Sequence, residues 1–164
     1  VMAHGVVRTD NLAGIYDGSK IVSIKFNNGT ADAEIDNGSI VSLDAYLGQD
    51  VYKAVKPAAE QKLGKLVLVA GVELFKDREK PLDQWVNEAG VPCRGYVLQQ
   101  GDVFSVTADV IDGTPDATTN KYADIEAATT LKAGAVAGSG KTNFAELIAI
   151  ETAGAYTYYV YRVL

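Results

Sequence analysis

The residue types most often used in catalysis are scarce in this sequence. Its 164 residues include one histidine, His4, and one cysteine, Cys93. An intramolecular disulfide therefore cannot form, and a Cys/His zinc site within one chain is excluded because structural zinc takes about four such ligands. A Ser-His-Asp or Cys-His centre would have to use His4, close to the start of the chain. Cys93 follows Pro92 with no histidine nearby to lower its pKa, so we interpret it as a small buried hydrophobic residue.

The segment from Ala135 to Thr142 comes nearest to a nucleotide-binding motif. Its sequence, Ala-Val-Ala-Gly-Ser-Gly-Lys-Thr, fits a phosphate-binding loop in which alanine replaces the leading glycine. Such a loop needs a buried strand before it, a helix after it, and a separate strand ending in an acidic residue that organises magnesium. The final strand of the chain contains no Asp or Glu. We therefore expect no nucleotide site at Lys141 and interpret residues 138–140 as a flexible hairpin tip.

Three carboxylates, Asp32, Glu34 and Asp36, alternate along the sequence as they would on one face of a strand. Such a set could bind calcium weakly, but it lacks the closely spaced Asp and Asn residues around a glycine that calcium loops usually show. We interpret it as a solvated strand edge, where charge also discourages aggregation. A glycosidase pair cannot be assigned either, because the sequence does not fix the separation of two carboxylates. We therefore predict no catalytic, cofactor-binding or metal-binding residues and a protein that is not an enzyme.

Glycine-containing turns divide the N-terminal part of the chain into short segments. The turn signals are Asp17-Gly18, Asn28-Gly29 and Asn37-Gly38, and the β-rich runs lie at residues 21–26, 39–43, 51–55 and 66–70. Asn-Gly and Asp-Gly tolerate the positive φ angles of tight hairpins. A spacing of roughly 8–12 residues between turns is typical of small sandwiches and barrels. The pattern predicts a mainly β (α+β) fold, a small β-barrel or β-sandwich-like domain of short antiparallel strands.

One short helix is predicted over residues 81–89. Pro81 suits the first helical position, and Leu82, Trp85, Val86 and Ala89 follow at the spacing of one helix face. Gly90 and Pro92 supply a stop. A helix this short is not stable alone, so we expect Trp85 to anchor it to the core rather than to stack on a ligand.

The C-terminal half returns to strand patterns. Strands are predicted at residues 96–98, 103–107 and 143–151, followed by the aromatic run from Tyr156 to Leu164, and the last two are expected to form a hairpin. Four of the nine tyrosines lie between Tyr156 and Tyr161, and so occupy both faces of one strand. At least one face must meet another protein element, either the core of this domain or a partner. The sequence leaves those two alternatives open.

The charge balance excludes several classes of partner. Fifteen Lys and Arg residues stand against 21 Asp and Glu, which gives a net charge of -6. Nucleic-acid binding relies on clustered Lys and Arg, so we expect no nucleic-acid partner. No apolar stretch of about 18 residues is present, so we expect no membrane partner. The length fits one β-rich domain over residues 1–164, with a flexible N-terminal arm over residues 1–14.

Several blocks of the sequence resemble one protein family. They are Leu66 to Arg78, Leu82 to Gly90, Arg94 to Leu98, Gly101 to Thr107, Ile148 to Glu151 and Tyr156 to Leu164. Together they are similar to the auxiliary capsid proteins, also called head decoration or cement proteins, of tailed phages. The resemblance implies a structural protein of the virion that binds the major capsid protein on the outer surface of the assembled shell, stabilises it, and self-associates there. The family has no catalytic residues to transfer.

A carbohydrate-binding or adhesin-type β module is the alternative function. In such a module an exposed Trp85 or the tyrosines would stack on sugars. The acidic balance of the chain fits the capsid interpretation, because a net charge of -6 favours a position on the outside of the virion, away from the genome.

Overall fold

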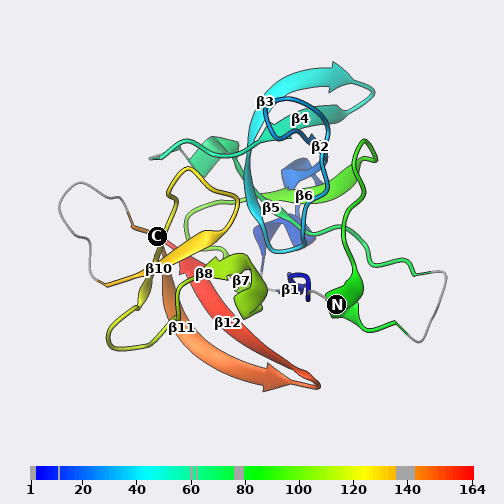
Figure 1. The fold of residues 1–164 in the computed structure, drawn as a ribbon. Helices are drawn as coiled ribbons and strands as arrows, with labels where there is room; N and C mark the ends of the chain where they lie inside the picture. Colours follow the sequence, from blue (N-terminus) through cyan, green and yellow to red (C-terminus); the bar gives the residue numbers. More distant parts are fainter. Residues whose placement is uncertain (1–2, 11, 60, 62, 76–79, 136–142) are drawn as a thin grey trace.

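The computed structural model describes residues 3–10, 12–59, 61, 63–75, 80–135 and 143–164 (Figure 1). These residues form twelve β-strands in two sheets, and their only helices are 3-10 turns. The prediction of a mainly β fold is therefore confirmed. None of these helices is long or apolar enough to cross a membrane in the part of the chain described.

Five strands close into a barrel in the first part of the chain. They are β2 (Ile21–Phe26), β3 (Ile40–Gly48), β4 (Val51–Val55), β5 (Leu66–Val69) and β6 (Cys93–Val97), in the order β2-β4-β3-β5-β6. The predicted meander is wrong in one respect, because β2 pairs with β4 in parallel instead of forming a hairpin with β3. The long connection after β2 permits this. It makes a local turn at the Asn27–Asp32 bridge and then pairs through Ile35 with Asn87 before β3 begins.

Seven strands form an open sheet from the two ends of the sequence. They are β1 (Val7–Arg8), β7 (Val103–Val106), β8 (Ile111–Asp112), β9 (Tyr122–Asp124), β10 (Leu131–Gly134), β11 (Asn143–Ala153) and β12 (Tyr156–Val163). Their order is β1-β7-β12-β11-β9-β10-β8, and every pair is antiparallel except β10 with β8. The predicted terminal hairpin is confirmed as β11 and β12.

Strand β5 lies between two hydrophobic cores, as its continuous apolar sequence requires. Leu66 and Leu68 belong to a core shared by the barrel and the open sheet, whereas Val67 and Val69 fill the interior of the barrel. The shared core also contains Tyr96 from β6 and Phe104 and Tyr161 from the open sheet. The two sheets thus pack on each other with β5 in the middle.

The helix predicted over residues 81–89 is much shorter in the structure. Only Leu82–Gln84 is helical, as the 3-10 turn η4, and Trp85 already has an extended backbone with φ -81° and ψ 133°. The reason is tertiary pairing: the backbone N–H and C=O of Asn87 both bond to Ile35, at 3.0 and 3.1 Å. Those groups are unavailable to a helix, so a long-range bridge overrides the local 3.6-residue pattern. Leu82, expected on the buried face, is exposed.

The remaining 3-10 turns lie in connections: η1 (Ala13–Ile15), η2 (Gly18–Lys20), η3 (Leu63–Lys65) and η5 (Ala108–Val110). Asp17-Gly18 does not form the predicted hairpin turn, because Asp17 accepts a hydrogen bond from Ser19 N and caps η2. The described part of the predicted N-terminal arm pairs with the open sheet through β1. Val6 is buried there, and its N–H donates to Thr107 Oγ1 at 3.0 Å.

Candidate partner-binding groove

A groove of about 560 Å³ opens beside β2 and β6 on the barrel, and we call it the barrel groove. Four aliphatic side chains that line it are exposed, and Leu74 is the most exposed of them at 76%. The other three are Ile21, Val72 and Val91. A gathering of exposed aliphatic side chains in a concave surface is typical of an interaction site, since scattered single ones would need no explanation.

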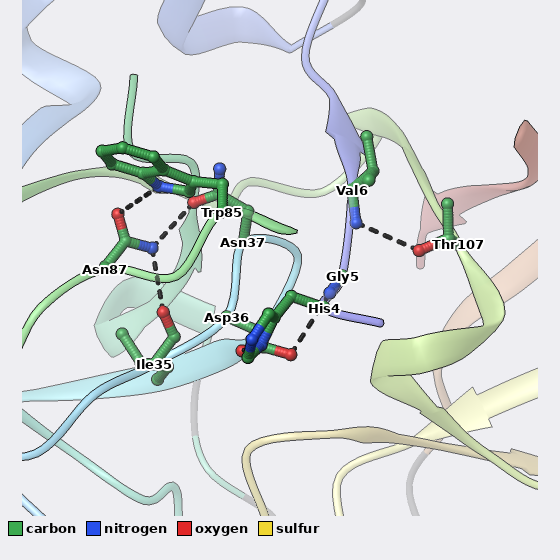
Figure 2. Close-up of polar contacts among 9 residues, drawn as sticks. All are labelled: His4, Gly5, Val6, Ile35, Asp36, Asn37, Trp85, Asn87 and Thr107. Carbon is green, nitrogen blue, oxygen red and sulfur yellow. Dashed lines mark hydrogen bonds and ion pairs between the residues drawn. The ribbon is translucent and has the colours of Figure 1, made fainter. Parts of the chain in front are cut away.

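One buried asparagine, Asn87, lines this groove, and a second buried asparagine, Asn37, is hydrogen-bonded to it. Asn37 Oδ1 accepts hydrogen bonds from Asn87 Nδ2 and from Gly71 N, both at 2.8 Å, and Asn87 Nδ2 also donates to Ile35 O at 3.0 Å. Figure 2 shows Asn87 between Ile35 and Asn37, with the indole of Trp85 above it. We call Asn37, Gly71 and Asn87 the amide network. It joins three segments distant in sequence, so it fixes the position of the groove wall.

The side-chain Nδ2 group of Asn37 holds the segment of residues 71–75 at the groove. Its Nδ2 donates to Gly71 O at 2.9 Å and to Glu73 Oε1 at 3.0 Å. Gly71 is required here because a Cβ on it would overlap Asn87 Oδ1. The side-chain amides of Asn37 and Asn87 therefore all have partners, which is the condition for buried polar groups to stabilise a fold.

Trp85 lines the barrel groove instead of anchoring the core. Its extended backbone turns the half-buried indole into the groove wall, where Nε1 donates to Asn87 Oδ1 at 3.2 Å. Its ring packs almost perpendicular to Phe75, with the centroids 5.3 Å apart. The prediction of a core anchor is therefore wrong, for the same reason that the helix is short.

Cys93 also lines the groove. Burial raises the pKa of its thiol to about 11, so the side chain stays neutral at physiological pH. It packs against the core inside the barrel. Its predicted behaviour as a small hydrophobic residue is confirmed, although its burial is partial.

His4, Glu34 and Asp36 line a smaller cavity of about 270 Å³, whereas Asp32, the first of the three alternating carboxylates, does not. Asp36 accepts from His4 Nδ1 at 2.8 Å and from Gly5 N at 3.2 Å, so it fastens the N-terminal segment (Figure 2). The predicted strand edge is wrong, because this stretch is a connection with two isolated bridges. Among the described residues, no three His, Cys, Asp or Glu side chains are grouped to hold a metal ion.

The crowded tyrosines of β12 contact this chain on both faces. Tyr161 is fully buried and stacks on Phe104, with centroids 6.0 Å apart. Tyr158 is buried under Arg8, whose guanidinium carbon lies 5.4 Å from the ring centroid. Tyr156 Oη accepts a hydrogen bond from Asp83 N at 3.3 Å. The alternative left open by the sequence is thus answered in favour of the protein's own core for Tyr158 and Tyr161.

Most of the segment that resembles a phosphate-binding loop, including Lys141 and the predicted flexible tip at 138–140, lies outside the described residues. The flanking strands are informative. A strand, β11, begins at Asn143, where a phosphate-binding loop would need a helix. Both β10 and β11 pair with β9, which lies between them, so the connection joins two strands that are not hairpin partners.

The amide network is the part of the site that sequence reasoning missed. Asn37 is the first residue of the predicted Asn-Gly turn, and Gly38 does adopt a positive φ of 86°. Nothing in the local sequence indicates that the side chain of Asn37 is buried. No family model, no curated protein and no solved structure matches this chain. The geometry of the groove and the sequence resemblance therefore carry the functional argument.

Proposed function

We propose that this protein is a phage head decoration protein that binds the outer surface of the assembled capsid and stabilises it. The observation that carries the proposal is the barrel groove, a preformed concave surface with four exposed aliphatic side chains. Gly71 and Asn87 in its lining are held by hydrogen bonds to the buried Asn37, so we expect a partner to meet a surface that needs little reordering. Such preorganisation lowers the entropic cost of association.

The mechanism is thermodynamic linkage. A protein that binds the assembled shell, and not its dissociated subunits, lowers the free energy of the assembled state. Many copies on a symmetric lattice repeat this small gain at each site. The net charge of -6 keeps the free protein soluble and gives it no attraction to packaged DNA.

The direct test is co-sedimentation with expanded capsids that were assembled without this protein. We expect wild type to bind and to raise the melting temperature of the capsids. Leu74→Lys places a charge on the most exposed groove residue and should weaken binding by about tenfold, the equivalent of about 1.4 kcal/mol. Leu47→Lys is the matched control, because Leu47 is also exposed but belongs to β3 and does not line the groove.

The outcomes distinguish whether the protein binds capsids from whether it does so through the barrel groove. If wild type fails to bind capsids, the proposed function is wrong. If wild type binds and both lysine variants bind equally well, the protein decorates the capsid through another surface.

The second candidate function is a carbohydrate-binding module, and the position of Trp85 favours it. The indole lines the barrel groove beside Glu88 and Arg94, whose polar groups could bond to sugar hydroxyls. Against it, the indole N–H is already bonded to Asn87, and the most exposed groove residues are aliphatic. Binding to a glycan array that is lost in Trp85→Ala, together with no binding to capsids, would establish this alternative.

A further inference from the structure

The hairpin of β11 and β12 continues past its neighbours in the open sheet. β9 pairs with β11 only from Asn143 to Glu146, with one further bond from Leu147 N to Lys121 O at 2.7 Å. On the other side, β7 pairs with β12 only from Tyr159 to Arg162. Residues 148–158 therefore form a two-stranded ribbon beyond the sheet, which Figure 1 shows as the orange and red arrows at its lower end.

The outer edge of β11 is open along this ribbon. Within the described residues, no strand pairs with the side of Ile148 to Ala153 that faces away from β12. In an antiparallel strand, alternate backbone N–H and C=O groups point to that outer side. They form a ready template for another strand.

Side chains that usually protect such an edge are missing here. Lysine and proline are the common protective residues, and neither occurs from Ile148 to Ala155. Two exposed isoleucines stand there instead, Ile148 at 51% and Ile150 at 50%. A bulge after Leu147 and the charge of Glu151 are the protective features of this edge, and the strand continues regularly beyond the bulge. An open edge with exposed isoleucines is a surface that a partner covers.

We propose that the outer edge of β11, from Ile148 to Ala153, binds an extended segment of the capsid protein as an added β-strand. This inference rests on the proposed function and names a second contact, one that shares no residue with the barrel groove. Backbone hydrogen bonds would supply affinity, and alternate side chains would supply specificity. Two separate contacts let one copy bind two places on the lattice, which is what a cement protein requires.

Charge selects the capsid segment over a second copy of this chain. The only charged side chain on the open edge is Glu151, and the whole protein carries -6. A second copy would bring the same negative charges to the interface. Ile150 lies opposite Tyr159, while Glu151 lies opposite Tyr158 and 3.6 Å from Arg8 Nη1. The fitting occupant therefore has apolar residues on the Ile150 face and no acidic residue near Glu151, whose charge is already paired with Arg8.

Hydrogen exchange measured by mass spectrometry tests this directly. Peptides that cover residues 148–153 should exchange at least about tenfold more slowly in the capsid-bound protein than in the free protein, since strand addition protects the outward amides. Peptides from β3 and β4 in the closed barrel serve as the internal reference, and their exchange should not change.

Two matched variants provide a second test of the added strand. Ile150→Lys places a protective charge on the open ribbon and should weaken capsid binding by about tenfold. Ile15→Lys alters the same residue type at an exposed position in η1 and should bind as wild type does. Both sites are exposed, so both variants should fold, and circular dichroism checks this.

The results distinguish the two proposals. No capsid binding by wild type overturns both. Capsid binding with unchanged exchange at 148–153 and a normal Ile150→Lys variant overturns the added strand and leaves the decoration function in place. A dimer of free protein in sedimentation equilibrium, with the same amides protected, would assign the edge to self-association and overturn the capsid segment as its occupant.

Discussion

The barrel and the open sheet differ in whether their strand edges are covered and in how their buried polar groups are paired. The barrel closes on itself, so each of its strands has two neighbours, and its mouth carries a buried amide network in which the polar groups are paired. The open sheet ends in the two-residue strands β1 and β8 and extends the unpaired ribbon of β11 and β12. Its core is aromatic and aliphatic, with the buried Tyr161 hydroxyl lacking a hydrogen-bond partner among the described residues. Both regions have hydrophobic cores, but the barrel side adds paired side-chain amides, whereas the buried hydroxyl of Tyr161 in the sheet is held by packing.

The largest test of this difference is Asn37→Ala. The substitution removes the acceptor for Gly71 N and Asn87 Nδ2 and leaves both donors buried. Each unpaired buried group costs about 1–3 kcal/mol, so unfolding free energy should fall by about 3 kcal/mol or more. Urea denaturation measures it. Asn28→Ala is the control, since Asn28 caps an exposed turn and its loss should cost under about 1 kcal/mol. An equal loss of unfolding free energy in the two variants would mean that the buried amide network contributes no more than an exposed turn.

A smaller effect is expected from Gly71→Ala. The new methyl group would overlap Asn87 Oδ1 and push the amide network apart, at a cost of about 2 kcal/mol. Gly64→Ala is the matched control, because no atom lies within 4 Å of a Cβ built there. Thermal unfolding of both variants shows whether the network tolerates displacement. A Gly71→Ala protein as stable as the Gly64→Ala protein would mean that it does.

The smallest effect is expected from Tyr161→Phe in the open sheet. Removing a buried hydroxyl that has no partner should leave stability unchanged or raise it by up to about 1 kcal/mol. Tyr156→Phe is the comparison on the same strand, since it removes the acceptor of Asp83 N and should lower stability by about 0.5–1 kcal/mol. A loss of more than 1 kcal/mol in Tyr161→Phe would show that the sheet core also depends on a polar contact.

The sequence predicted strands better than it predicted their partners. The boundaries of β4 and the hairpin of β11 and β12 follow from alternation and from a compact turn, which are local signals. The parallel pairing of β2 with β4 is not local, and neither is the Ile35–Asn87 bridge that ends the predicted helix. β8 and β9 are too short, at two and three residues, to give a periodic pattern.

The candidate groove was less predictable than the fold. Its rim comes from β2, from residues 71–74 and from residues 91–94, which only the tertiary structure brings together. Trp85 was identified as important from its type, but its direction depends on the backbone that Asn87 and Ile35 impose. Asparagine is usually an exposed residue, so the sequence pattern gave no indication that Asn37 and Asn87 form a buried network.

The position of β5 has a consequence for how the chain folds. Its alternate side chains belong to two cores, so neither core is complete until this strand is in place. Loss of β5 would open the barrel and uncover the inner face of the open sheet in the same event. The two sheets should therefore unfold in one cooperative transition. The four-residue strand β5 is the element that makes them a single folding unit.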